Sequence, residues 1–147
     1  MTRAGQLLGC LLLLTTLGRA EVLCSDPLAT TETQALVRHL QTLAPQHILF
    51  GHQDTLAYGL GWRGDDFNSD VYRVCGKFPA VFGWDLGHIG DANNIDGVPF
   101  ADVKRWIRKA YRRGGVITIS WHARVPGTGE SAWTERPVVE HILPGGR

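Results

Sequence analysis

Small and bulky side chains alternate along residues 116–122, which read Val-Ile-Thr-Ile-Ser-Trp-His. Successive side chains of a β-strand point to opposite faces of the sheet. One face of this stretch therefore carries small side chains and ends on His122, whereas the other carries Ile117, Ile119 and Trp121. The pattern predicts a strand with a helix layer on its bulky face and a polar residue at its C-terminal tip.

The same division recurs in residues 80–85, which read Ala-Val-Phe-Gly-Trp-Asp. Phe82 and Trp84 share the bulky face of this second predicted strand, and the small face ends on Asp85. We therefore assign Trp84, like Trp121, to the core beneath the helices.

A first, shorter strand is predicted at the apolar residues 48–50, directly before the sequence Gly-His-Gln-Asp that contains His52. Residues 56–66 are rich in glycine and are expected to form a long loop. The chain thus offers three strands, each followed by polar residues.

Helices are predicted between the strands by apolar residues at helical spacing. The first spans residues 27–44 and has a capping-box pattern at Thr31, and a short one that runs through Val74 is expected to be capped by Ser69. A third is opened by Pro99. Its predicted apolar stripe comprises Phe100, Val103, Ile107, Ala110 and Tyr111.

Alternating helices and strands indicate an α/β fold with a parallel sheet and right-handed crossovers. No Gly-x-Gly-x-x-Gly sequence follows any strand, so a dinucleotide-binding fold has no support. Polar residues at the C-terminal tips of parallel strands are typical of a (β/α)8 barrel, which needs about 250 residues. We therefore expect the 147 residues to form about three βα units, the N-terminal part of such a barrel.

The formal net charge of +1 argues against a nucleic-acid-binding domain, which usually has a clearly basic balance. Six basic residues on the third predicted helix are explained by a solvated face. They are Lys104, Arg105, Arg108, Lys109, Arg112 and Arg113. No His/Cys cluster has metal-ligand spacing, and the acidic loop at residues 91–96 is explained by turn chemistry, so we predict neither a metal nor another cofactor.

The first residues have the features of a secretory signal peptide: Arg3, an apolar run over residues 7–17, and small residues before Ala20. We predict cleavage after Ala20, a mature domain over residues 21–147, and a secreted or periplasmic location. The apolar run is too short to span a bilayer, so no membrane anchor is expected. In such a compartment Cys24 and Cys75 could form a disulfide, although two free thiols explain them equally well.

Four motifs, in order, resemble glycoside hydrolase family 26, which is dominated by secreted endo-β-1,4-mannanases. They are residues 48–54 (Ile-Leu-Phe-Gly-His-Gln-Asp), 79–87 (Pro-Ala-Val-Phe-Gly-Trp-Asp-Leu-Gly), 110–122 (from Ala-Tyr-Arg-Arg-Gly-Gly to Ser-Trp-His) and 142–146 (Ile-Leu-Pro-Gly-Gly). The resemblance implies a (β/α)8 barrel and a retaining enzyme with two catalytic glutamates, one after the fourth strand and one after the seventh. Both would lie beyond Arg147, so no catalytic residue is assigned, and the chain by itself is expected to be inactive. Val125 stands where comparable members tend to carry Asn, which removes one polar side chain near the sugar.

The candidate substrate-binding residues follow from the strand tips and the resemblance. We assign this role to His122, Asp85 and His52, each of which has a structural alternative as a buried, hydrogen-bonded side chain or a loop cap. Trp133 could stack on a pyranose ring or pack in the core. The expected ligand is β-mannan or a related polysaccharide or oligosaccharide. The alternatives to part of a mannanase are a non-catalytic carbohydrate-binding protein and the product of a truncated gene.

Overall fold

The computed structural model describes residues 24–134 and 144–145, and the chain divides into two compact units after His47. In the first unit, helix α1 (Thr31–Leu43) is capped by Thr30, whose hydroxyl accepts a hydrogen bond from the Thr33 amide. The expected cap at Thr31 is therefore wrong by one residue. The predicted signal peptide over residues 1–20 lies outside the described residues and stays a prediction.

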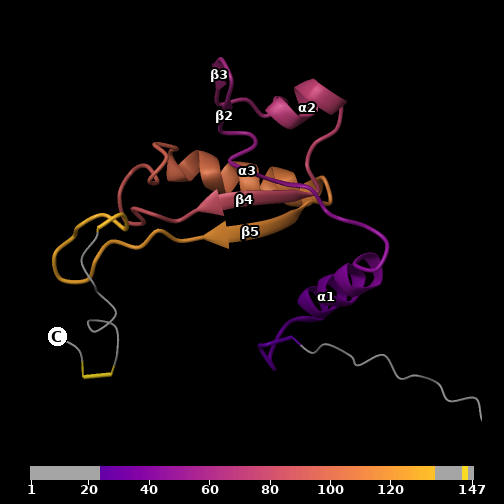
Figure 1. The fold of residues 1–147 in the computed structure, drawn as a ribbon, viewed down its shortest axis with the longest axis horizontal. Helices are drawn as coiled ribbons and strands as arrows, with labels where there is room; N and C mark the ends of the chain where they lie inside the picture. The colour runs from indigo at the N-terminus through magenta and orange to yellow at the C-terminus, as the bar shows by residue number, and fades with distance from the viewer. Residues whose placement is uncertain (1–23, 135–143, 146–147) are drawn as a thin grey trace, which may run out of the picture. The chain divides into compact units, whose positions relative to one another are not determined.

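The second unit is built on a three-stranded parallel sheet in the order β1-β4-β5. Its strands are β1 (Gly51–Gln53), β4 (Val81–Asp85) and β5 (Val116–Ser120). Helix α3 (Phe100–Arg112) connects β4 to β5 and packs on both, and the two strands run side by side in the same direction (Figure 1). The predicted α/β class with a parallel sheet is confirmed.

The core lies between α3 and the bulky face of β4. Phe82 is 1% exposed and Trp84 is fully buried, as the alternation of β4 predicts. Trp84 stacks on Trp106 of α3, with ring centroids 6.1 Å apart and an angle of 13° between the planes. On the opposite face of β4, Gly83 leaves the space that the Gln53 side chain of β1 occupies. The bulky face of β4 therefore packs against α3, and its small face leaves room for a side chain from β1.

Three details of the core differ from the predictions. The buried residues of α3 are Val103, Trp106 and Ala110, whereas Tyr111 is 69% exposed. The helix is thus rotated relative to the predicted stripe, because Trp106 turns inward to stack on Trp84. Trp121 is 65% exposed, and Ile119 on the same face within β5 is 50% exposed, so the described residues leave this end of the bulky face of β5 uncovered.

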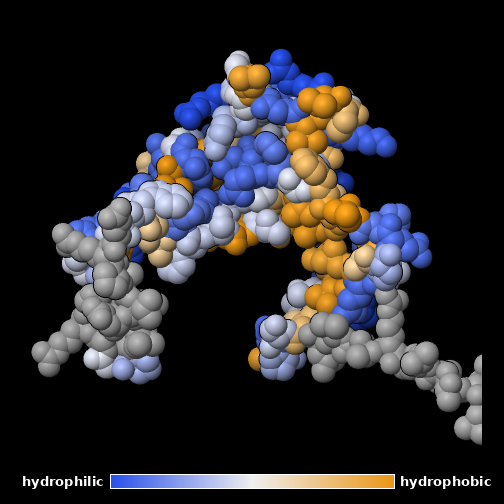
Figure 2. Space-filling model, viewed as in Figure 1, coloured by the Kyte–Doolittle hydropathy of each residue, from blue (hydrophilic) through white to orange (hydrophobic). Residues whose placement is uncertain are grey.

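The first strand also differs from its prediction. The paired residues of β1 and β4 begin at Gly51, and of the apolar run only the Phe50 carbonyl bonds to β4, accepting from the amides of Ala80 (3.0 Å) and Val81 (3.2 Å). The side chains of the run are uncovered, with Ile48 99% exposed and Phe50 61% exposed. Figure 2 shows hydrophobic residues on the surface of this part of the second unit. The apolar run at residues 48–50 therefore precedes the strand and does not form it.

The expected loop at residues 56–66 contains a small antiparallel hairpin of β2 (Tyr58–Gly59) and β3 (Trp62–Arg63). Asp70 holds it, because its carboxylate accepts hydrogen bonds from the Leu60 amide (2.8 Å) and from Trp62 Nε1 (2.7 Å). Asp70 also opens helix α2 (Asp70–Cys75). The predicted start of that helix is confirmed, since Ser69 is its N-cap.

Asp66 links the segment after the hairpin to α3. Its carboxylate accepts a hydrogen bond from Trp106 Nε1 (2.7 Å) and pairs with Lys109 (2.9 Å) and Arg105. The hydrogen bonds from Lys109 and Trp106, followed by those from Arg105, outweigh desolvation and lower the pKa of Asp66 to about 2. Asp66 is therefore ionised at neutral pH and fixes the rotation of α3 that buries Trp106.

None of the helices within the described residues is long and apolar enough to cross a membrane. Cys24, half-buried, and Cys75, exposed, are both free thiols in the structure. They belong to the two separate units, and the disulfide between them stays a prediction.

Candidate functional site

The site is built where β4 and β5 end at the same edge of the sheet. The parallel register places Asp85 opposite Ser120, and His122 follows two residues later. Asp85 is 1% exposed, yet its Oδ2 lies 2.5 Å from the Ser120 hydroxyl and 2.6 Å from His122 Nδ1. Its other oxygen accepts a hydrogen bond from the Gly87 amide at 2.6 Å. Two of the predicted site residues, Asp85 and His122, therefore form one hydrogen-bonded unit.

Burial alone would raise the pKa of Asp85, but the hydrogen bonds from Ser120, Gly87 and His122 outweigh it and lower the pKa below its ordinary value. Asp85 is therefore an ionised acceptor at neutral pH. An ionised carboxylate can only accept, so His122 must carry a hydrogen on Nδ1. This leaves Nε2 of His122, whose side chain is 41% exposed, available to a ligand.

Trp133 lies against the same histidine. The ring centroids of His122 and Trp133 are 4.8 Å apart and their planes are inclined by 40°. Because the indole is 70% exposed, core packing does not explain its position. The histidine edge and the indole surface together offer a hydrogen-bonding group beside a flat apolar face, which is a combination that binds a sugar ring.

His52 lies on β1, on the other side of β4 from β5. Its Nδ1 is 2.6 Å from the Thr55 hydroxyl, within its own loop, and the ring is half-buried. The structure therefore brings together three of the four predicted binding residues, His122, Asp85 and Trp133, and gives His52 a local partner. Nothing in the structure tests whether His52 contacts a ligand, and that role stays a prediction.

Ser120 is a site residue that the sequence analysis did not single out. Its hydroxyl donates to Asp85 and so helps to keep that carboxylate ionised. The signal was present, because Ser120 shares the small face of its strand with His122. Val125, the residue that departs from the resembled pattern, is 5% exposed and closes a turn in which its amide donates to the Glu130 carbonyl (2.9 Å).

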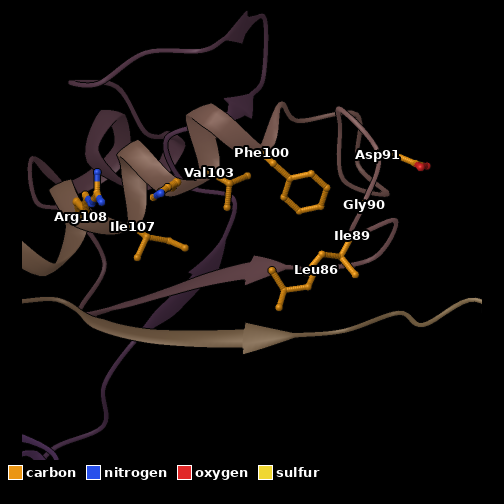
Figure 3. Close-up of a pocket in the computed structure, with 9 residues that line it drawn as sticks. Leu86, Ile89, Gly90, Asp91, Phe100, Val103, Ile107 and Arg108 are labelled. Carbon is orange, nitrogen blue, oxygen red and sulfur yellow. The ribbon is translucent and has the colours of Figure 1, made fainter.

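A separate groove of about 500 Å³ lies between α3 and the loop after β4 (Figure 3). Apolar side chains from both elements point into it, with Asp91 and Arg108 at its ends, and Lys104 also lines it. The apolar members are Leu86, Ile89, Phe100, Val103 and Ile107. This lining differs from the polar edge at Asp85 and suits the packing of another apolar element better than a sugar.

Metal binding has no geometric support in the described part of the chain, where no three His, Cys, Asp or Glu side chains are grouped so that they could hold an ion. The acidic loop between β4 and α3 is instead organised by Asn94, which is 2% exposed. Its side-chain oxygen accepts hydrogen bonds from the amides of Asp96 (3.0 Å) and Val98 (2.9 Å). This is the turn chemistry expected of such residues.

Comparison with known proteins identifies the family. The model of Glycosyl hydrolase family 26 matches residues 25–141. A mannan endo-1,4-beta-mannosidase of Bifidobacterium adolescentis is 33% identical in an alignment of 132 positions that covers 84% of this chain and 13% of that protein. Among solved structures, a family-26 β-mannanase of Bacteroides ovatus is 44% identical with a TM-score of 0.75. The match covers 80% of this chain and 36% of the Bacteroides ovatus protein. A modular endo-β-1,4-mannanase of Cellulomonas fimi is 39% identical with a TM-score of 0.68. That match covers 80% of this chain and 28% of the Cellulomonas fimi protein. The chain thus spans little more than a third of these relatives at most, and it belongs to glycoside hydrolase family 26.

Proposed function

We propose that this chain supplies part of the mannan-binding cleft of a secreted, retaining, mannanase-like glycoside hydrolase. The observation that carries the proposal is the unit of Asp85, His122 and Trp133 at the C-terminal edge of the sheet. Barrel enzymes place their ligands at this edge. The names of the relatives supply the substrate class, which is β-mannan for the Bacteroides ovatus protein and β-1,4-linked mannan for the Cellulomonas fimi protein.

Within the cleft, each residue has a distinct role. Trp133 presents its exposed face to the apolar side of a mannose ring, and His122 Nε2 bonds to a sugar hydroxyl or ring substituent. Asp85 does not touch the sugar, because it is buried and bonded to three donors, and it acts as a positioning residue that sets the tautomer of His122. His52 is a further candidate contact on the neighbouring strand β1.

Hydrolysis by these 147 residues is not part of the proposal. Retaining cleavage needs two carboxyl groups about 5 Å apart, one as nucleophile and one as proton donor. Asp85 is an ionised acceptor, which suits positioning and does not suit proton donation. The family resemblance places both catalytic glutamates after strands that follow the three of this sheet. We therefore assign binding to this chain and cleavage to an enzyme that also contains those strands.

Titration of the 147-residue chain with mannohexaose, followed by calorimetry and product chromatography, tests this function. We expect saturable binding without released products. Trp133→Ala should weaken binding about tenfold, equal to about 1.4 kcal/mol, because it removes the stacking surface. Trp121→Ala is the matched control, since Trp121 is similarly exposed but precedes His122 outside the unit, and its affinity should match that of the unsubstituted chain.

Two outcomes would contradict the proposal. Equal losses in Trp133→Ala and Trp121→Ala would show that the unit does not define the binding surface. Product release that persists in the 147-residue chain would refute the separation of binding from cleavage. Binding to cello-oligosaccharides as strong as to mannohexaose would keep the cleft and change the substrate.

Export is the second part of the proposal, and it rests on the charged start, the apolar run and the small residues before Ala20. Expression in a host that exports the chain should give a mature protein that begins at Glu21. Intact-mass measurement of the exported protein checks this result. A protein that retains residues 1–20 and stays inside the cell would disprove export.

A further inference from the structure

Two loops at the C-terminal edge of the sheet pack against each other. Leu56 and Ala57, just after β1, belong to the same buried cluster as Val98 of the loop between β4 and α3. Ala57 and Val98 also line one cavity of about 240 Å³. The turn organised by Asn94 presents Asp96 from the second loop. Asp54 and Asp96 are therefore carried by two segments that are already in contact.

Asp54 is fully buried, and the mannan-binding unit does not use it. Its backbone has a φ of 50°, in the left-handed region, and its amide donates to the Gly83 carbonyl at 3.0 Å. One carboxyl oxygen, Oδ2, is 3.5 Å from the Tyr58 hydroxyl, whereas Oδ1 is buried without a hydrogen-bond partner. Leaving an ionised oxygen buried in this way costs several kcal/mol.

The missing partner of Oδ1 follows from the groups around it. Asp96 from the loop after β4 acts on the Asp54 carboxyl through its charge and hydrogen bonding, Tyr58 from β2 through a hydrogen bond, and Asp85 from β4 through its charge alone. Two ionised carboxyl groups can only accept hydrogen bonds, so neither can satisfy the other. A proton held between the two carboxyl groups gives the pair the donor that two ionised carboxylates lack.

The electrostatics favour the same protonation state. Burial, followed by the charge and hydrogen bond of Asp96, raises the pKa of Asp54 from 3.8 to about 7. Tyr58 opposes this shift by hydrogen bonding to Asp54, and Asp85 adds to it through its charge. Asp54 thus holds a proton at pH values where an exposed aspartate has lost it.

We propose that Asp54 and Asp96 share one proton, and that this proton latches the loop after β1 to the loop between β4 and α3. When the pH rises, the proton passes to solvent and two negative charges remain face to face. The second loop also donates its Gly87 amide to Asp85. The latch therefore supports the loop whose Gly87 amide bonds to Asp85 of the mannan-binding unit. The shared proton itself does not depend on which ligand that unit binds.

Thermal melts of the 147-residue chain across pH test the latch. The folded state binds more protons than the unfolded state between pH 3.8 and about 7, so its stability should fall as the pH rises through that window and then level off. We expect the Tm of the unsubstituted chain to fall by roughly 5 °C between about pH 5 and about pH 8, and we expect this fall to disappear in Asp54→Asn.

The Tm of Asp54→Asn should equal that of the unsubstituted chain at the lower pH and be higher than it at the higher pH. Asparagine tolerates the left-handed backbone and can donate to Asp96, so this variant is expected to fold.

Asp91→Asn is the matched control, because Asp91 lies exposed in the same loop as Asp96 and pairs with Arg124. It should shift Tm equally at both pH values. Infrared difference spectra provide a measurement that does not depend on melting: near pH 6, the chain minus Asp54→Asn should show a protonated-carboxyl band. An absent band, or a pH dependence that Asp54→Asn retains, would overturn the shared proton.

Discussion

Replacement of Asp85 by alanine is expected to destabilise the chain by about 3 kcal/mol and to weaken mannohexaose binding by at least tenfold. The carboxylate is 1% exposed and accepts hydrogen bonds from Ser120, Gly87 and His122. Removing it leaves these donors without an acceptor at a buried position. It also releases His122 from the orientation in which Nε2 faces the ligand.

Asp85→Asn separates the structural role from the positioning role. Its oxygen can still accept from Gly87, but its amide group now faces His122 Nδ1 as a donor. His122 is then forced into the tautomer with the hydrogen on Nε2. Nitrogen NMR of the imidazole should show this change of tautomer, together with a weaker affinity and a smaller loss of stability than in Asp85→Ala.

Ser120→Ala is the control for this series, because it removes one donor and keeps the carboxylate. It should leave the His122 tautomer unchanged. If Asp85→Asn kept both the tautomer and the affinity of the unsubstituted chain, the positioning role would be refuted. Calorimetric titration and chemical denaturation of the three variants supply these comparisons.

Trp106→Ala is expected to lower the free energy of unfolding by about 4 kcal/mol. The indole is 2% exposed and stacks on Trp84, and its Nε1 donates to Asp66 at 2.7 Å. The substitution therefore leaves a cavity between α3 and β4 and removes a hydrogen bond to an ionised carboxylate. Trp106→Phe should cost less, since it keeps an aromatic ring in the stack and loses only part of the volume and the donor.

Chemical denaturation monitored by circular dichroism measures both variants. Trp121→Ala is again the matched control, because its side chain is 65% exposed and lies beyond the end of β5. It should change the free energy of unfolding by less than about 0.5 kcal/mol. Similar losses in Trp106→Ala and Trp121→Ala would mean that Trp121 is as buried as Trp106 in solution.

The alternation of small and bulky residues was sufficient to predict β4 and the core position of Trp84. It failed for Trp121 and for Ile119, which is 50% exposed although it lies within β5, because alternation assigns a side chain to a face and does not say whether another element covers that face. The helical spacing used for α3 missed Trp106, which the predicted apolar stripe left out. The rotation of α3 depends on its stacking partner Trp84 and its acceptor Asp66, which lie far away in the sequence.

The site was predictable to the extent that parallel strands end at one edge of a sheet. That rule brings Asp85 and His122 together from their strand positions alone. The contact between Trp133 and His122 was not predictable, because it depends on the path of a loop without periodicity. The local bond of His52 to Thr55 depends likewise on a turn whose geometry the hydrophobic pattern does not encode.

The hydrogen bond between Ser120 and Asp85 joins residues 35 positions apart in the sequence. The intervening chain includes the whole of α3, so the carboxylate meets its partners only after that long loop has closed and the helix has docked. Loop closure has an entropic cost that local structure cannot offset until the distant contacts form. Folding of this unit and assembly of its ligand site are consequently a single kinetic event. The onset of mannohexaose affinity during refolding should therefore coincide with the last step of chain collapse.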